Sequence, residues 1–83
     1  LYTLRGGKVN LVEIDVPASA REPMPRISEL DLPEDAVLVC IFRGDDTVIA
    51  RGPIRLKPRD QVIALTTPEL EDELRASVLQ GRR

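Results

Sequence analysis

The chain has 83 residues, of which 42% are hydrophobic and 31% charged, and its formal net charge is −2. This length indicates one domain with a thin core, since a chain this short buries only about 60–65% of its unfolded surface. Self-association is one way for such a domain to bury more apolar surface. The plentiful Val, Ile and Leu exclude intrinsic disorder, while the acidic balance and only two aromatic residues, Tyr2 and Phe42, argue against a nucleic-acid binder.

The cysteine and histidine content limits which disulfides, reactive thiols and metal sites the chain can form. Cys40 is the only cysteine, so no disulfide can form within one chain, which fits a reducing compartment. It lies inside an apolar run, where a small buried hydrophobe is expected rather than a reactive thiol. Histidine is absent, and we expect no metal and no cofactor. No apolar run approaches the ~20 residues that span a bilayer.

The first quarter of the chain predicts a linker, a strand and a loop. Residues 1–8 contain Arg-Gly-Gly-Lys and are expected to be a flexible linker from a missing upstream domain. Apolar and acidic residues alternate in 9–16, which is typical of a strand with one solvated face. The polar, proline-bounded segment 18–24 is expected to be a loop.

The next stretch predicts a short helix and the central strand. Ile27 and Leu30 share one face of a short helix that stops before Leu32-Pro33, because the residue before proline avoids the α region. Residues 37–42 are all apolar, and this pattern predicts a central strand buried on both faces.

The remaining chain predicts further strands and a closing helix. A Gly-Asp-Asp turn after Arg43 joins the central strand to 47–50 as a hairpin. A short half-exposed strand at 54–57 and a strand at 61–66 follow, separated by a proline turn in which Asp60 is expected to bind backbone amides. Thr67 and Pro68 are typical of a helix start.

That helix is amphipathic and ends near Gly81. Leu70, Leu74 and Val78 form its apolar stripe, and Glu71 pairs with Arg75. The predicted fold is α+β: a small, mostly antiparallel sheet of four to five strands, with a short helix after the first strand and a C-terminal helix. The domain is expected to cover residues 9–80.

No residue pattern indicates catalysis. Adjacent acids such as Asp45-Asp46 and Glu34-Asp35 suit solvated turns rather than a shared pocket with separated pKa values. Ser28 and Ser77 lack a histidine base. We therefore expect that the protein is not an enzyme.

Arginines are the better candidates for ligand contacts. Arg43 leaves the apolar strand and Arg26 opens the short helix, and guanidinium groups suit phosphate or carboxylate. We predict Arg26 and Arg43 as contacts for a small anionic ligand. Surface ion pairing is the alternative interpretation for these arginines.

The order of these segments resembles the TrkA C-terminal domain family, also called the RCK C-terminal domain family, of potassium transport regulatory proteins. The match runs from about Val9 to Val78. The motifs that carry it are Leu-Asp-Leu-Pro at 30–33, Ile-Phe-Arg-Gly at 41–44 and Leu-Lys-Pro-Arg-Asp at 56–60. In the last of these, Arg59 stands where the family has a glycine, which often supplies a positive φ.

The resemblance implies a cytoplasmic regulatory domain, peripheral at the inner face of the membrane. Its implied partners are an upstream dinucleotide-binding domain and a membrane potassium transporter or channel. The family domain commonly forms a homodimer and senses small ligands, cyclic di-AMP or ions in some members. Here the acidic Glu34-Asp35 step repels a phosphodiester, which argues against cyclic di-AMP.

Three hypotheses follow. The first is a ligand-sensing, dimerising regulatory domain with Ile27, Leu30 and Leu32 at the dimer interface; packing of these residues on their own sheet is the alternative. The second is a purely structural dimerisation module without a ligand. The third, a small β-barrel that binds nucleic acid, conflicts with the acidic charge.

Overall fold

The computed structural model describes residues 2–80, and its framework is a five-stranded antiparallel sheet with strand order β1-β2-β5-β3-β4. The strands are β1 (Tyr2–Leu4), β2 (Val9–Asp15), β3 (Ala36–Arg43), β4 (Asp46–Ile49) and β5 (Gln61–Thr66). Three 3₁₀ turns and a helix complete the fold: η1 (Arg5–Gly7), η2 (Ile27–Glu29), η3 (Pro68–Leu70) and α1 (Glu71–Leu79). The predicted α+β class is confirmed, with its C-terminal helix.

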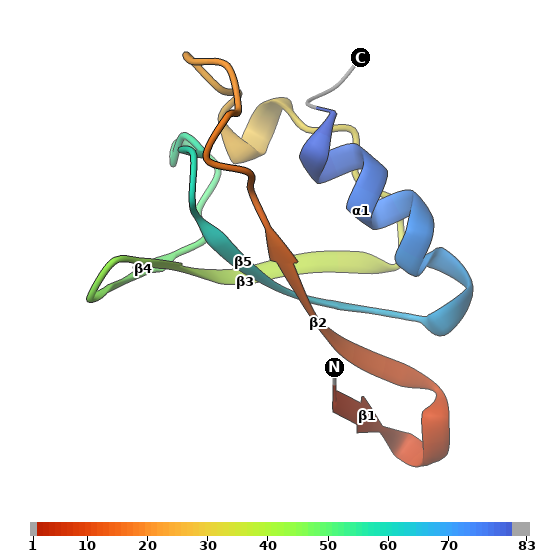
Figure 1. The fold of residues 1–83 in the computed structure, drawn as a ribbon. Helices are drawn as coiled ribbons and strands as arrows, with labels where there is room; N and C mark the ends of the chain where they lie inside the picture. The colour runs from red at the N-terminus through yellow and green to blue at the C-terminus, as the bar shows by residue number, and fades with distance from the viewer. Residues whose placement is uncertain (1, 81–83) are drawn as a thin grey trace.

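The sheet is covered on one face. Figure 1 shows α1 and the η2 segment on the same side of the strands. Alternation along the strands supplies the matching side chains: Val12 pairs with Ala64 and Ile14 with Val62 across β2 and β5, and all four are buried. Period-2 alternation thus places one set of side chains under the helix.

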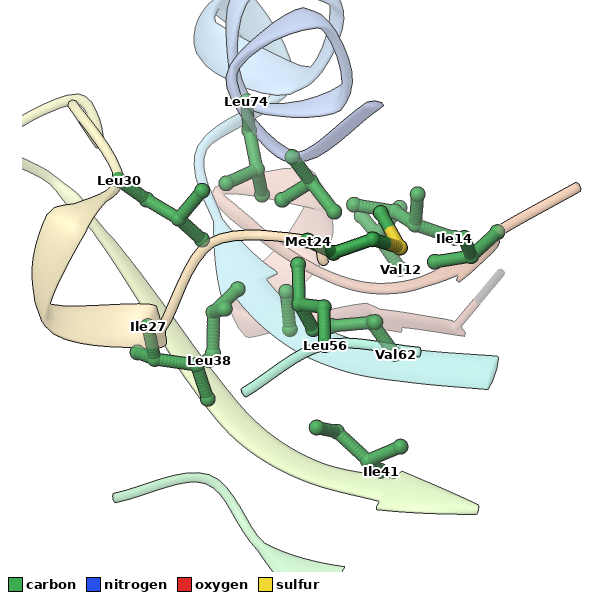
Figure 2. Close-up of a cluster of buried hydrophobic side chains, with 13 residues drawn as sticks. Val12, Ile14, Met24, Ile27, Leu30, Leu38, Ile41, Leu56, Val62 and Leu74 are labelled. Atoms are coloured by element: carbon green, nitrogen blue, oxygen red, sulfur yellow. The ribbon is translucent and has the colours of Figure 1, made fainter. Parts of the chain in front are cut away.

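The core joins the covered face of the sheet to the elements above it. Met24 of the loop after β2 and Leu74 of α1 are both buried members of this core, and both are labelled in the close-up (Figure 2). Leu56 fills the space beside β5 and is fully buried, although it belongs to no strand. Loss of a fully buried leucine of this kind typically costs about 2–5 kcal/mol.

The prediction for 37–42 is wrong in two respects. The centre of the sheet is β5, and β3 lies between β5 and the edge strand β4. Only one face of β3 is buried, because Leu38 and Ile41 point into the core while Val37 and Phe42 are 52% and 41% exposed. Cys40, expected to be buried, is half-exposed. The strand is continuously apolar because both of its faces carry apolar side chains, not because both are covered.

Three further segments differ from expectation. Residues 2–4, predicted as part of a flexible linker, form β1 and pair with β2; the role of 1–8 as a connection to an upstream domain stays a prediction. Residues 54–57 are not a strand, and their backbone makes an isolated bridge between Arg55 and Arg26. The predicted helix after β2 is the single 3₁₀ turn η2.

The C-terminal helix follows the predicted pattern. Leu74 and Val78 are fully buried, and Arg75 pairs with Glu71 at 3.4 Å. Pro68 lies in the 3₁₀ turn η3 that leads into α1, and the Thr67 side chain makes no capping bond. Gly81, the predicted stop, lies outside the described residues. No helix in residues 2–80 is long and apolar enough to cross a bilayer.

The turn before β5 explains how the family glycine is replaced. The Asp60 N–H donates to the Lys57 carbonyl at 3.2 Å, Pro58 occupies the second position, and Arg59 has φ +73°. This is the pattern of a type II turn, which needs a positive φ at its third position. Arg59 therefore adopts the backbone conformation that a glycine there would adopt, at a steric cost.

We predict that Arg59→Gly raises the free energy of unfolding by about 0.5–1 kcal/mol. Glycine removes the steric strain of the left-handed conformation, and this gain exceeds the extra chain entropy that glycine loses on folding. Urea denaturation measures the change. Arg51→Gly is the matched control: Arg51 is also exposed but has no positive φ, so this change should lower stability. Equal losses for both variants would contradict the strain assigned to Arg59.

Candidate functional site

A buried ion pair closes one end of the sheet. The Arg43 Nε–H donates to Asp60 Oδ1 and a terminal Arg43 N–H donates to Asp60 Oδ2, both at 2.9 Å. The Asp60 side chain is fully buried, and that of Arg43 is 27% exposed. This two-pronged contact is the geometry that a guanidinium and a carboxylate favour.

Each partner of the pair also holds nearby backbone. The Lys57 N–H donates to Asp60 Oδ2 at 2.8 Å, which confirms the predicted role of Asp60 in its turn. Arg43 donates to the Arg55 carbonyl at 2.9 Å. The hydrogen bond to Asp60 raises the pKa of Arg43 above its ordinary value, against the lowering effect of burial. The guanidinium therefore stays charged in the folded domain. Through these bonds the pair holds β3, the 55–57 segment and the start of β5 together.

Arg26 lies next to the same segment. The Ile27 N–H donates to the Ile54 carbonyl at 2.8 Å, and the Leu56 N–H donates to the Pro25 carbonyl at 3.0 Å. These bonds flank the bridge between Arg26 and Arg55. The backbone N–H of Arg26 donates to the Glu29 carboxylate at 2.8 Å, and Arg26 itself is exposed. The η2 turn is thus docked on 54–56 through its backbone.

The structure brings the two predicted ligand contacts to one segment. Arg43 reaches the Arg55 carbonyl and Arg26 bridges Arg55 through its backbone, while the Arg55 guanidinium donates to the Met24 carbonyl at 2.6 Å. Arg43 is already committed to Asp60, a role that sequence reasoning did not assign to it. Of the two, Arg26 offers the more accessible guanidinium. Ligand contact by either stays a prediction.

The three predicted interface residues belong to the covered side of the domain. Ile27 and Leu30 are each 9% exposed and form part of the core, and Leu32 packs against it (Figure 2 labels Ile27 and Leu30). This is the packing on their own sheet that the sequence left open as the alternative. Their interface role stays a prediction, and little of their apolar surface is available to a partner.

Sequence reasoning missed a shallow groove of about 430 Å³ at the other end of β3. Val9, Val37 and Leu65 line it from three strands, and the acidic pair Glu34-Asp35 borders it. Six residues of strand separate Val37 from Arg43, which is about 20 Å at 3.3 Å per residue. The groove is mainly apolar, and within residues 2–80 no cluster of three metal-ligating side chains is present. The period-2 geometry of β2 and β5, which puts Val9 and Leu65 on the face of the sheet opposite the core, was the signal that could have revealed it.

We predict that Arg43→Ala lowers the free energy of unfolding by about 2–3 kcal/mol, because it leaves a buried carboxylate with one backbone donor; partial exposure of Arg43 reduces the cost below that of a fully buried pair. Arg43→Lys should lose about half as much, since an ammonium cannot bind both carboxylate oxygens and the Arg55 carbonyl. Chemical denaturation measures both.

Arg75→Ala is the matched control for this prediction. It removes the arginine of the exposed Arg75–Glu71 pair, and such surface pairs contribute at most about 0.5 kcal/mol. Similar losses for Arg43→Ala and Arg75→Ala would show that the Arg43–Asp60 pair has no special structural role.

Comparison with known proteins agrees with this fold. Residues 11–79 match the family model of the TrkA-C domain. The chain is 34% identical over 74 residues to the Trk system potassium uptake protein TrkA of Mycobacterium tuberculosis, an alignment that covers 89% of this chain and 34% of that protein. It is 31% identical over 69 residues to the Trk system potassium uptake protein TrkA homolog of Archaeoglobus fulgidus, covering 83% of this chain and 16% of that protein.

The chain thus spans about a third and a sixth of the length of these two relatives. The family model covers most of the 83 residues and includes β5, α1 and the Arg43–Asp60 pair. The resemblance inferred from the sequence motifs is confirmed: the chain belongs to the TrkA-C domain family.

Proposed function

We propose that this domain is a cytoplasmic regulatory domain of a potassium uptake or channel protein, and that it senses a small anionic ligand and forms a homodimer. The observation that carries the proposal is the match of residues 11–79 to the TrkA-C domain, together with the potassium uptake proteins among the relatives. Its partners are an upstream dinucleotide-binding domain and a membrane potassium transporter or channel.

The arginine-bearing segment supports the ligand part of this proposal. Arg26 presents an exposed guanidinium beside Arg55, and its backbone is held on 54–56 by two flanking hydrogen bonds. Because its backbone is already fixed, this cation loses only side-chain entropy when it binds an anion, at a cost of about 0.5–1.5 kcal/mol. A ligand that prefers one dimer geometry shifts the population by its differential affinity. That shift is the signal passed to the transport partner.

A purely structural dimerisation module is the second candidate. The commitment of Arg43 to Asp60 favours it, because this arginine already has its carboxylate. In that case the domain would respond to no small molecule, and its contribution to transport would be to hold two copies of a larger protein together.

The ligand is tested by calorimetry and thermal shift on the 83-residue chain with inorganic phosphate, AMP, cyclic di-AMP and potassium chloride. We expect an anion to raise Tm and to bind about tenfold more weakly to Arg26→Ala, the loss of one charge-assisted hydrogen bond. Arg21→Ala, at an exposed position of the loop after β2, is the control and should bind as the wild type does. Absence of any response would leave the structural module as the function.

The transport role is tested in cells. Deletion of the gene that encodes this chain should slow potassium uptake and growth at limiting potassium, and added potassium or the restored gene should reverse the defect. Unchanged potassium uptake in the deletion strain would contradict the assignment to potassium transport.

A further inference from the structure

The face of the sheet opposite α1 carries apolar and acidic side chains, and within residues 2–80 the register places no Lys or Arg of any strand on it. We call this side of the sheet the open face. Its acids are Glu13 and Asp15 of β2, and both are exposed. Its apolar residues are Val9 and Leu11 of β2, Ile63 and Leu65 of β5, Val37 and Phe42 of β3, and Ile49 of β4. Monomeric proteins rarely expose so many neighbouring apolar side chains without a binding role.

The groove at one end of the open face has a fixed acidic rim. Glu34 and Asp35 border its apolar floor, and both are exposed. The Thr66 hydroxyl donates to the Asp35 carbonyl at 2.9 Å, and this bond holds the rim against β5. Neither these two acids nor the two acids of β2 form an ion pair with any residue in the described part of the chain. Four carboxylates on or beside an apolar surface therefore have no cation as a partner.

We propose that the open face, at this groove, binds an amphipathic helix of another protein that carries Lys or Arg at both ends of an apolar stripe. The apolar stripe lies on Val9, Val37 and Leu65, and the cations meet the unpaired carboxylates. This interaction goes beyond the proposed function, because it needs neither the small ligand nor the homodimer.

The spacing of the acids sets the spacing of the cations. Asn10 and Ala36 both pair with Thr66, which places Asp35 level with the residue before Asn10. Glu13 lies four residues farther along β2 and two strands across, which is about 13 Å by 10 Å and a separation of about 16 Å. An α-helix rises about 1.5 Å per residue, so about eleven residues, or three turns, span this distance and return to the same face of the helix.

The charge of the open face favours this partner over the alternatives. Nucleic acid and anionic lipid would bring phosphate groups against unpaired carboxylates. A second copy of the chain offers the same acids and no cation on its own open face, so it would leave the carboxylates unpaired. A cationic helix supplies the opposite charge, which steers its approach and fixes its register. It also gives the open face the helical cover that α1 gives the other face of the sheet.

Binding is measured by fluorescence anisotropy with a labelled synthetic helix of about 18 residues, in which leucine forms the apolar stripe and lysine fills the other positions. The same peptide with glutamate in place of lysine is the comparison. We expect the lysine peptide to bind the 83-residue chain about tenfold or more tightly than the glutamate peptide. Amide chemical shifts should change at Val37 and Leu65 and stay constant along α1. A lysine peptide that does not bind, or that binds no better than the glutamate peptide, would overturn the proposal.

The double variant Glu34→Lys, Asp35→Lys tests the acidic rim. It should bind the lysine peptide about tenfold more weakly, because two attractions become repulsions. Asp45→Lys, Asp46→Lys is the matched control: it makes the same charge change at exposed positions between β3 and β4. This control should bind as the wild type does at about 0.15 M salt, where the Debye length is about 8 Å.

Circular dichroism checks that both double variants are folded. Equal weakening by the two double variants would show attraction to the net charge alone, and full binding by the rim variant would show that the rim takes no part. Either result would overturn the groove as the binding surface.

Discussion

The bond between Arg43 and Asp60 is the interaction on which the arrangement of the domain depends. It joins the end of β3 to the turn before β5, and through the Arg55 carbonyl it fixes a segment with no strand of its own. That segment in turn holds η2 through backbone hydrogen bonds. A small domain with a thin hydrophobic core gains specificity from such a polar anchor, because a buried carboxylate tolerates few alternative arrangements.

The second constraint is that one helix and one short turn cannot cover two faces of a sheet. In this fold α1 and η2 lie on the same side (Figure 1), so the apolar side chains of β3, β4 and β5 on the other side meet no part of residues 2–80 that would bury them fully. These side chains form an exposed apolar surface, while the Arg43–Asp60 pair lies at the end of β3.

Local patterns predicted most of the fold. Alternation found β2, the apolar residues after the proline turn found β5, the Gly-Asp-Asp signal found the β3–β4 hairpin, and the Leu74–Val78 stripe found α1. Sequence could not reveal which faces are covered, because an apolar residue that meets a core and one that meets a partner look alike. It also could not place Arg43, whose carboxylate partner is 17 residues away. β1 was not predicted, because a strand of three residues is too short to show a period-2 pattern.

Arg43 and Asp60 act as one unit that holds this end of the sheet together. A double-mutant cycle on Arg43→Ala and Asp60→Ala tests it most directly, with unfolding free energies measured for all four proteins. We expect a coupling free energy of about 2 kcal/mol, within the range for residues in one buried network. Additive losses, with a coupling near zero, would contradict it.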